Sequence, residues 1–352
     1  MGKRLVLLFD DAAHIGREAS LVEFFDIFRT LSSSTVSCKA SIYPGVTNFG
    51  TRFDVYNDAT VVDVVRDEDQ LGFADLFVEI MRARFPQLLE RPLSSDLQLG
   101  SLASFLGKSV LGNMRSFIFA CNALQETDEK SIGLASIGQT FVTLTTNYYW
   151  PLLDEVKPKL GKYEPVIEPS RAIAEMLLRQ GKTSVLVHRE IISRLLKAFE
   201  ILEYLGFIGK RESSRAMKSG GRGCRYALNL CMLYENVPGR RLTVDLFNKW
   251  TDRTEEPAEL HIKGTATNSI KMPLPIEGAE LGILSEPVEK LRKSQTYPYG
   301  LTEKMIETLL KGGYTNVKGL SEATDEELDK LPWVGTATVR RMKNVVGQAI
   351  WL

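Results

Sequence analysis

Two adjacent carboxylates, Asp10 and Asp11, follow a short apolar run that starts after Arg4. A buried strand that ends in acidic side chains can present them to a magnesium ion on a bound nucleotide. Phosphate binding by a P-loop would require the pattern G-x-x-x-x-G-K-[ST] between a strand and a helix. The chain has two partial matches, but Leu102 and Met176 occupy the place of the first glycine. We therefore expect acidic metal ligands without the loop that holds the phosphates.

The elements around these acids alternate between strand and helix patterns. Apolar residues at helical spacing predict a helix over 19–30, and β-branched alternation predicts a strand over 35–43. A third apolar stretch predicts a strand over 59–65. Strands that alternate with helices are typical of a parallel α/β sheet, so we expect this architecture at the start of the chain.

The ordered residues of this region resemble the AAA+ ATPases, and within them the origin-recognition and initiator-like branch, over about residues 4–125. The resemblance implies that 5–11 is a Walker B strand. Asp10 would then hold magnesium through water, and Asp11 would polarise the attacking water. The family usually has glutamate at the second position, so the shorter Asp11 departs from the pattern.

Three further positions carry the resemblance. Thr47 or Asn48 would be sensor 1 at the γ-phosphate, and Arg52 would be the arginine finger. Arg115, in Gly-Asn-Met-Arg, would be sensor 2 on a helical lid. An arginine finger acts on the nucleotide of a neighbouring subunit, so the resemblance implies a homo-oligomer.

Simpler interpretations of the same residues remain open. The two acids could cap the next element or face water, and Arg115 could be a solvated lid residue. Arg52 could be a surface arginine paired with Asp54 or Asp58.

Without a P-loop, ATP and magnesium are conditional cofactors. In the AAA+ family the P-loop strand lies in the middle of the sheet, so its absence would leave the neighbouring strands with unpaired edges. Three explanations follow, in order of preference. The sequence is the C-terminal part of a longer polypeptide, a partner chain completes the sheet, or the sheet is a degenerate scaffold. In each case we expect the isolated chain to bind ATP poorly.

The middle of the chain, after prolines near residue 165, predicts helices over 170–180 and 188–205 and a β-hairpin over 207–233 with a glycine-rich tip. This order resembles a winged helix. Between Arg179 and Arg225 the chain has eleven basic and four acidic residues, although its overall formal charge is zero. A local excess of this kind favours binding to double-stranded DNA through phosphates over a solvated surface or a protein-docking wing. The predicted contacts on the helix and wing are Arg189, Arg194, Lys197, Lys210, Arg211, Arg215, Lys218, Arg222 and Arg225.

The end of the chain predicts an extended connector over 261–298 and a compact helical region after it. Thr324 and Glu327 have the spacing of a capping box. Residues 299–352 resemble helix-hairpin-helix domains, in which backbone amides at a tight turn bind phosphates. Trp333 replaces the usual first hairpin glycine. Basic and acidic residues balance from Tyr297 onward, so a helical interaction domain without DNA contact remains an alternative. The predicted DNA contacts here are Gly335, Thr336, Arg340 and Arg341.

The bulk composition is ordinary for a globular protein, with 44% hydrophobic and 25% charged residues. Four scattered cysteines without C-x-x-C spacing, and the lack of an apolar stretch of membrane-spanning length, predict a soluble cytoplasmic protein.

The predicted fold class is an α/β partial AAA+ module with a helical lid, a winged-helix (α+β) domain and a small all-α helix-hairpin-helix domain. The predicted domains are 1–70 (α/β core), 71–160 (lid), 165–260 (winged helix), 261–298 (linker) and 299–352 (helix-hairpin-helix). Together they predict a DNA-binding AAA+-type subunit or fragment in which nucleotide state controls DNA engagement. The alternative is a non-enzymatic adaptor that binds proteins through a degenerate AAA+ module and winged helix.

Overall fold

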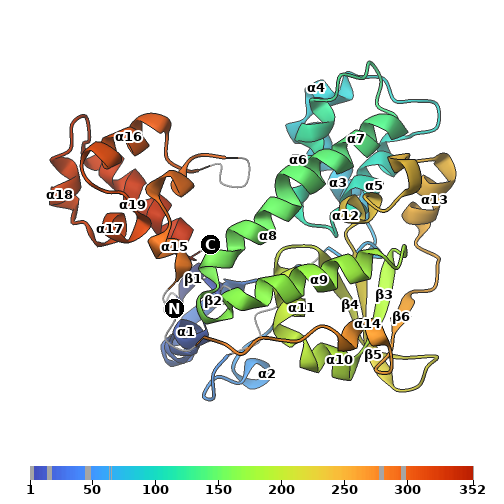
Figure 1. Ribbon diagram of the computed structural model, residues 1–352, viewed down its shortest axis with the longest axis horizontal. Coiled ribbons are helices and arrows are strands. Elements are labelled where there is room, and N and C mark those ends of the chain that lie inside the picture. The colour runs from blue at the N-terminus through green and yellow to red at the C-terminus, as the bar shows by residue number, and fades with distance from the viewer. Residues whose placement is uncertain are drawn as a thin grey trace. The chain divides into compact units, whose positions relative to one another are not determined.

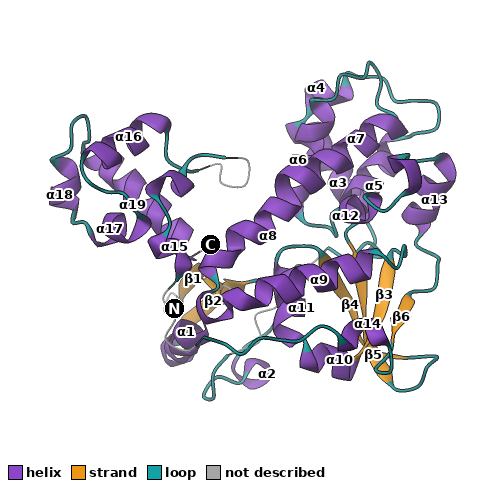
Figure 2. Ribbon diagram, in the orientation of Figure 1, coloured by secondary structure: helices purple, strands orange, loops and turns teal. Residues whose placement is uncertain are grey.

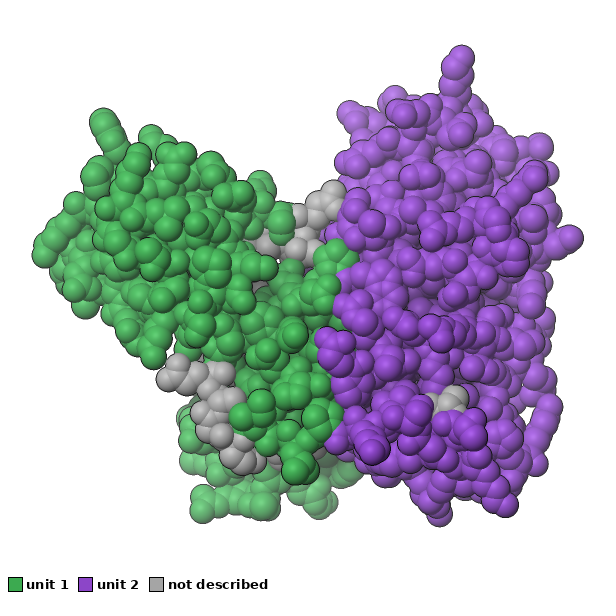
Figure 3. Space-filling view, viewed as in Figure 1, with its two compact units in different colours: residues 1–60, 151–167, 273–352 green, residues 61–150, 168–272 purple. Residues whose placement is uncertain are grey.

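The computed structural model describes residues 4–13, 18–43, 49–62, 64, 66–276, 281–294 and 299–351. The fold is mixed α/β, with many helices and two small sheets (Figure 2). Contacts divide the chain into two compact units, each built from separate stretches of sequence (Figure 3). Unit 1 comprises residues 1–60, 151–167 and 273–352, and unit 2 comprises residues 61–150 and 168–272.

Unit 1 begins with a strand-helix-strand module, residues 4–60. Its strands are parallel neighbours, in register from Leu5 opposite Val36 to Phe9 opposite Ala40. The strand, helix and strand predicted from the sequence are confirmed, but the described residues of 59–65 form no regular structure. The elements of the module are β1 (Leu5–Ala13), α1 (Glu18–Leu31), β2 (Val36–Ile42) and α2 (Val55–Asp58).

An aromatic cluster forms the core of this module. Phe25 of α1 stacks on Phe53 with ring centroids 5.0 Å apart, and Phe28 packs edge-on to the same ring. The remaining apolar surface is not covered, because Leu5 is 56% and Leu8 is 75% exposed on β1. Among the described residues this sheet has only two strands.

Unit 2 contains a helical bundle that is built around aromatic side chains. Phe105 stacks on Phe141 and lies 4.4 Å from the ring centroid of Phe247, so three helices meet at one ring. Helix α8 continues the bundle from Trp150, although its residues 151–156 are assigned to unit 1. The bundle comprises α3 (Phe73–Arg84), α4 (Pro86–Leu89), α5 (Leu99–Ser109), α6 (Met114–Gln125), α7 (Leu134–Leu144), a π-helical stretch (Thr145–Tyr149), α8 (Trp150–Val156), α12 (Leu230–Tyr234), a 3-10 helix (Pro238–Arg240) and α13 (Val244–Asp252).

The second sheet lies in the other part of unit 2, where its strands have the spatial order β4-β5-β3-β6. Strand β5 is antiparallel to both β4 and β3, and β6 is parallel to β3. Figure 1 shows helices α9 to α11 beside this sheet. The elements are α9 (Ile167–Leu178), β3 (Ser184–His188), α10 (Arg189–Arg194), α11 (Leu196–Tyr204), β4 (Ile208–Ala216), β5 (Arg222–Leu228), β6 (Ala258–Leu260) and α14 (Thr265–Asn268).

Two predicted boundaries in this region were wrong. The helix predicted over 188–205 is two helices, because Leu195 leaves helical geometry, and strand β3 precedes them. The return strand of the hairpin ends at Leu228. Asn229 then caps α12 by accepting hydrogen bonds from the amides of Cys231 and Met232, which starts a helix where strand was predicted.

The C-terminal part of unit 1 is a helical module that we call the tail module, residues 281–294 and 299–351. Its core includes Ile283, Val288 and Leu291, so the described residues 281–294 pack in the module and do not form the predicted extended connector. The predicted capping box is confirmed, since Thr324 and Glu327 exchange hydrogen bonds of 2.7 and 3.2 Å. Its helices are α15 (Gly282–Ser285), a 3-10 helix (Val288–Leu291), α16 (Glu303–Lys311), α17 (Val317–Glu322), α18 (Asp325–Asp329) and α19 (Thr336–Trp351) (Figure 1). Two 3-10 helices, Lys157–Lys159 and Gly161–Val166, complete unit 1.

Candidate functional site

The predicted metal ligand Asp10 lies near the carboxyl end of β1. Its side chain is exposed and accepts a hydrogen bond of 2.9 Å from the hydroxyl of Ser41 on β2. The side chain of Asp11 and all of Thr47 and Asn48 lie outside the described residues. The structure therefore places one of the four predicted nucleotide contacts in this module and leaves the other three untested.

The predicted arginine finger, Arg52, extends into solvent, with 77% of its side chain exposed. Its guanidinium lies 3.7 Å from Asp26, and its backbone carbonyl accepts a hydrogen bond from Arg29. The alternative that Arg52 is a surface arginine paired with Asp54 or Asp58 was wrong about the partner. Arg52 lies near Asp26, and Asp58 pairs with Arg29. The weak exposed pair with Asp26 leaves Arg52 able to reach another molecule.

The Gly-Asn-Met-Arg segment forms the turn between α5 and α6. Gly112 has a left-handed backbone, with φ of 75°, and a Cβ there would lie 2.3 Å from the carbonyl oxygen of Arg66. Asn113 caps α6 by accepting a hydrogen bond from the amide of Ser116. The glycine and the asparagine thus have structural roles, and only Arg115, which is exposed in the first turn of α6, remains for a ligand.

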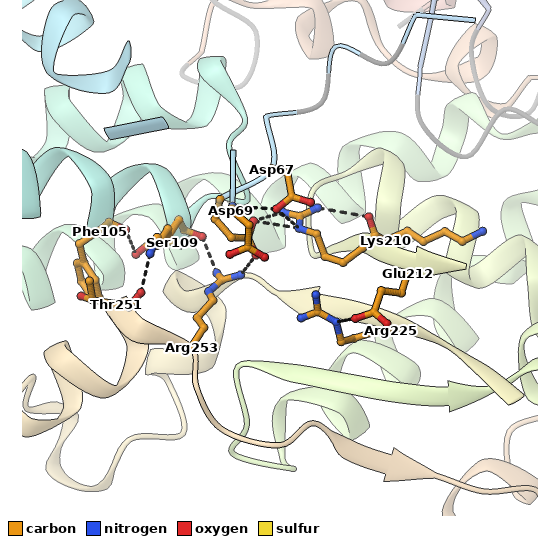
Figure 4. Close-up of polar contacts among 12 residues, drawn as sticks. Asp67, Asp69, Phe105, Ser109, Lys210, Glu212, Arg225, Thr251 and Arg253 are labelled. Atoms are coloured by element: carbon orange, nitrogen blue, oxygen red, sulfur yellow. Dashed lines mark hydrogen bonds and ion pairs between the residues drawn. The ribbon is translucent and has the colours of Figure 1, made fainter. Parts of the chain in front are cut away.

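Arg211, predicted to contact DNA, lies in a buried ion cluster and not on the surface. Its side chain is 3% exposed and donates hydrogen bonds of 2.9 and 2.6 Å to Glu68, which is 5% exposed. Arg253 donates to the other carboxylate oxygen of Glu68 and to the carbonyl of Lys108 (Figure 4). The prediction of Arg211 as a phosphate contact was therefore wrong, since its charge is already paired inside the protein.

The electrostatics of this cluster favour the charged form of Glu68. Burial opposes its ionisation, but attraction to Arg253 and the hydrogen bond from Arg211 outweigh burial and hold its pKa at about 2. Burial also lowers the pKa of Arg253, and the Glu68 carboxylate counteracts this. Sequence reasoning missed Glu68 and Arg253, because they lie 143 and 42 positions from Arg211 and no local pattern links them.

Several other basic residues of the β4–β5 hairpin also have acidic partners. Arg215 and Arg225 both pair with Glu212. Lys218 lies 3.6 Å from Glu256, and Glu259 accepts hydrogen bonds from the backbone amides of Lys218 and Ser219. Glu256 and Glu259 lie outside residues 179–225. The excess of basic residues within 179–225 therefore overstates the positive charge that is available to a ligand.

The helices beside the hairpin offer fewer cations than predicted. Lys197 of α11 pairs with the buried Glu200 at 2.6 Å, and residues 198–202 of α11 are buried. Arg194 of α10 donates hydrogen bonds to the carbonyl of Thr267 and the side chain of Asn268. The exposed predicted contacts without an acidic partner in any ion pair among the described residues are Arg189, Arg194, Lys210 and Arg222.

The tail module brings two tight turns together. The first follows α16 and contains Gly313, with φ of 88°, and the second contains Trp333, with φ of 64°. They are adjacent, because a Cβ on Gly312 would lie 2.4 Å from the side chain of Leu331. Trp333 thus has the left-handed backbone that favours glycine.

The start of α19 has unused hydrogen-bond donors. Within the described part of the chain, the backbone amides of Gly335, Thr336 and Ala337 have no acceptor. Arg340 lies one turn further along and is exposed. Arg341 is also exposed and makes a long contact of 3.5 Å with the carbonyl of Gly300. The four predicted contacts therefore lie together at one end of one helix.

No protein-family model, curated protein or solved structure matches the chain. The assignment of function therefore rests on the contacts described above.

The described residues contain no group of three or more histidine, cysteine, aspartate or glutamate side chains that could hold a metal ion. They also contain no helix whose length and hydropathy would let it cross a membrane. A pocket in unit 2 lies around Trp150, and several of its polar side chains pair with each other. Trp150 donates to Glu235 at 3.0 Å, and Arg179 pairs with Glu175.

Proposed function

We propose that the protein is a DNA-binding subunit or fragment of an AAA+-type ATPase of the initiator-like branch, which engages duplex DNA through its tail module and its β4–β5 hairpin. The observation that carries the proposal is the group of unpaired amides at Gly335, Thr336 and Ala337, at the start of a helix of 16 residues. Such a helix end attracts phosphate oxygens through its amides and its dipole. The exposed Arg340 adds a cation on the next turn. We propose that the tail module is a helix-hairpin-helix domain with these contacts.

The order of elements in unit 2 supports a winged helix. A helix, a strand, two helices and a hairpin follow each other as α9, β3, α10, α11 and β4–β5, and the hairpin pairs with β3 through β5. Because residues 198–202 of α11 are buried, we assign the DNA contacts of this domain to the hairpin and not to that helix. Lys210, Lys218 and Arg222 are its exposed cations.

The parallel pair of β1 and β2 supports an AAA+ α/β module with Asp10 at the Walker B position. Magnesium commonly binds one or two carboxylates together with phosphates, so Asp10 fits as one ligand of a metal that the phosphates also hold. The chain has no P-loop pattern, so ATP and magnesium binding depend on a phosphate-binding segment supplied elsewhere.

The exposed Arg52 supports a role in a homo-oligomer, where it would act on the nucleotide of the neighbouring subunit. In this proposal, nucleotide state changes the grip on DNA by shifting the protein between two conformations.

The proposal is tested by fluorescence anisotropy of a labelled duplex at low salt with the full chain. One variant neutralises the hairpin (Lys210→Gln, Lys218→Gln and Arg222→Gln), and another neutralises the tail (Arg340→Gln and Arg341→Gln). A control that loses two charges, like the tail variant, neutralises the exposed Arg82 and Lys130 of the helical bundle. We expect the wild-type chain and the control to bind, and both test variants to bind more weakly. Equal affinity in all four proteins, or no binding by the wild-type chain, contradicts the proposal.

One observation favours the second candidate function, a non-enzymatic adaptor. Val6 and Leu8, which share one face of β1, are 49% and 75% exposed, and neighbouring exposed apolar side chains are typical of protein-binding surfaces. The same experiment separates the two functions, since an adaptor would bind a protein partner and show no affinity for the duplex.

A further inference from the structure

The second turn of the tail module holds a tryptophan where the backbone favours glycine. Trp333 has φ of 64°, a conformation that a bulky side chain adopts at a cost in conformational energy. The neighbouring turn has Gly313 in the same left-handed region. The strain at Trp333 therefore comes from the choice of side chain and not from the shape of the turn.

The indole ring gains little from the fold in return for this strain. Trp333 is 87% exposed, so its apolar surface stays in water. Its one described ring contact is with the ammonium group of Lys304 on α16, which lies 5.7 Å from the ring centroid. A residue that is both strained and exposed indicates a role outside the folding of the module.

The surroundings of the ring favour a nucleic acid over an apolar protein pocket. Trp333 stands two residues before Gly335, the first of the three unpaired amides. Lys304 on α16 and Lys330 just after α18 are both exposed. Phosphate oxygens suit these donors and cations, and a flat aromatic ring suits the face of a base. A partner protein would have to desolvate both lysines and the free amides.

We propose that Trp333 stacks on an unpaired base, so that the tail module prefers DNA with a locally opened or single-stranded segment over fully paired duplex. This inference rests on the proposed DNA-binding function and adds the class of DNA structure. The adjacent amides of Gly335 and Thr336 bind the phosphate of the same strand, while the ring covers the exposed base. Fully paired duplex offers the phosphate contact only, because its bases are stacked on each other.

The test compares a blunt duplex with the same duplex carrying a short mismatch bubble, in which one unpaired base is the fluorescent 2-aminopurine. Trp333→Gly removes the ring and relieves the strain, and Trp333→Asn removes it with another residue that tolerates a left-handed backbone. Trp333→Tyr keeps a ring. Tyr56→Ala, which removes an exposed aromatic residue of the N-terminal module, is the matched control.

We expect the wild-type chain, Trp333→Tyr and Tyr56→Ala to bind the bubble more tightly than the blunt duplex and to quench 2-aminopurine. Trp333→Gly and Trp333→Asn should lose about ten-fold in affinity for the bubble, with little change for the duplex, and should lose most of the quenching. Trp333→Gly should also melt at the same or a higher temperature than wild type.

Three results would overturn the inference. If the wild-type chain binds both DNAs equally, and the glycine variant matches it, the ring has no role in DNA binding although the proposed function survives. If the glycine variant retains the preference for the bubble, another part of the chain selects the opened DNA. If the wild-type chain binds neither DNA, the proposed function itself fails.

Discussion

The β4–β5 hairpin and the tail module differ in how many of their positive groups are available to a ligand. The hairpin lies in the most basic stretch of the chain, yet Arg211 is buried against Glu68, and Arg215 and Arg225 share Glu212 as an acidic partner. The tail module has balanced charge, yet Arg340 and the amides at the start of α19 are free of acceptors in the described structure. A phosphate contact therefore depends on which donors the fold leaves unpaired, and a count along the sequence does not reveal this.

The largest expected effect is at Glu68, because its carboxylate is the closest acidic partner of both buried arginines, Arg211 and Arg253. Glu68→Ala should lower the free energy of unfolding of unit 2 by about 3–5 kcal/mol. Urea denaturation followed by circular dichroism measures this. The control is Asp69→Ala, an exposed acid in the same turn, which should cost less than about 0.5 kcal/mol. An equal and small effect of both variants would show that the cluster does not stabilise the fold.

Low pH should also remove the stabilisation by Glu68 in the wild-type chain, because it protonates the carboxylate. The folded-state pKa of Glu68 is about 2 and its ordinary value is 4.5, so its stabilisation is present above pH 4.5 and is lost as the pH falls toward 2. Urea midpoints measured between pH 6 and pH 2 should therefore fall more steeply in the wild-type chain than in Glu68→Gln. Parallel curves for the two proteins would contradict the assignment of this carboxylate.

Within α19, Lys343 is paired inside the protein and Arg340 is not, so their substitutions should have different effects. Lys343 donates hydrogen bonds to the carbonyls of Leu320, Ser321 and Ala323 at the end of α17, whereas Arg340 has no such role. Lys343→Met, which keeps the apolar stem, should cost about 1–2 kcal/mol of stability. Arg340→Met should leave stability unchanged and weaken DNA binding. A thermal melt and a duplex titration of both variants measure the two effects, and the reverse pattern would contradict the distinction.

The smallest expected effect is at the capping box of α18. Thr324→Ala removes the hydroxyl that accepts a hydrogen bond from the amide of Glu327, at a cost of about 1 kcal/mol. Thr324→Ser keeps the hydroxyl and should be nearly neutral. Because Thr324 and Glu327 are not among the proposed phosphate contacts, DNA affinity should not change in either variant, and a thermal melt with a parallel titration checks both statements.

The parts of the fold that the sequence predicted are those with local causes. The β1–α1–β2 order follows from apolar periodicity, and the Thr324 box follows from spacing over three residues. The sequence also marked Trp333 as a departure from the glycine expected in its turn.

The sequence-based predictions were wrong where residues far apart in the chain, or patterns common to helix and strand, determine the structure. Strand β3 is a short run of five buried residues that periodicity cannot separate from a helix. The end of the hairpin depends on a side-chain cap at Asn229. Arg211 was misplaced because Glu68 and Arg253, which bury its charge, come from segments far away in the chain.

The salt dependence of DNA binding measures how many phosphate contacts the tail module and the hairpin make. Each phosphate contact contributes about 0.9 to the slope of log affinity against log salt concentration. For the full chain and a labelled duplex, we predict binding that weakens as salt rises. The slope should fall by about one in Arg340→Gln and by about three when Lys210, Lys218 and Arg222 are replaced together. Absence of binding at low salt, or the same slope in all three proteins, would contradict the account.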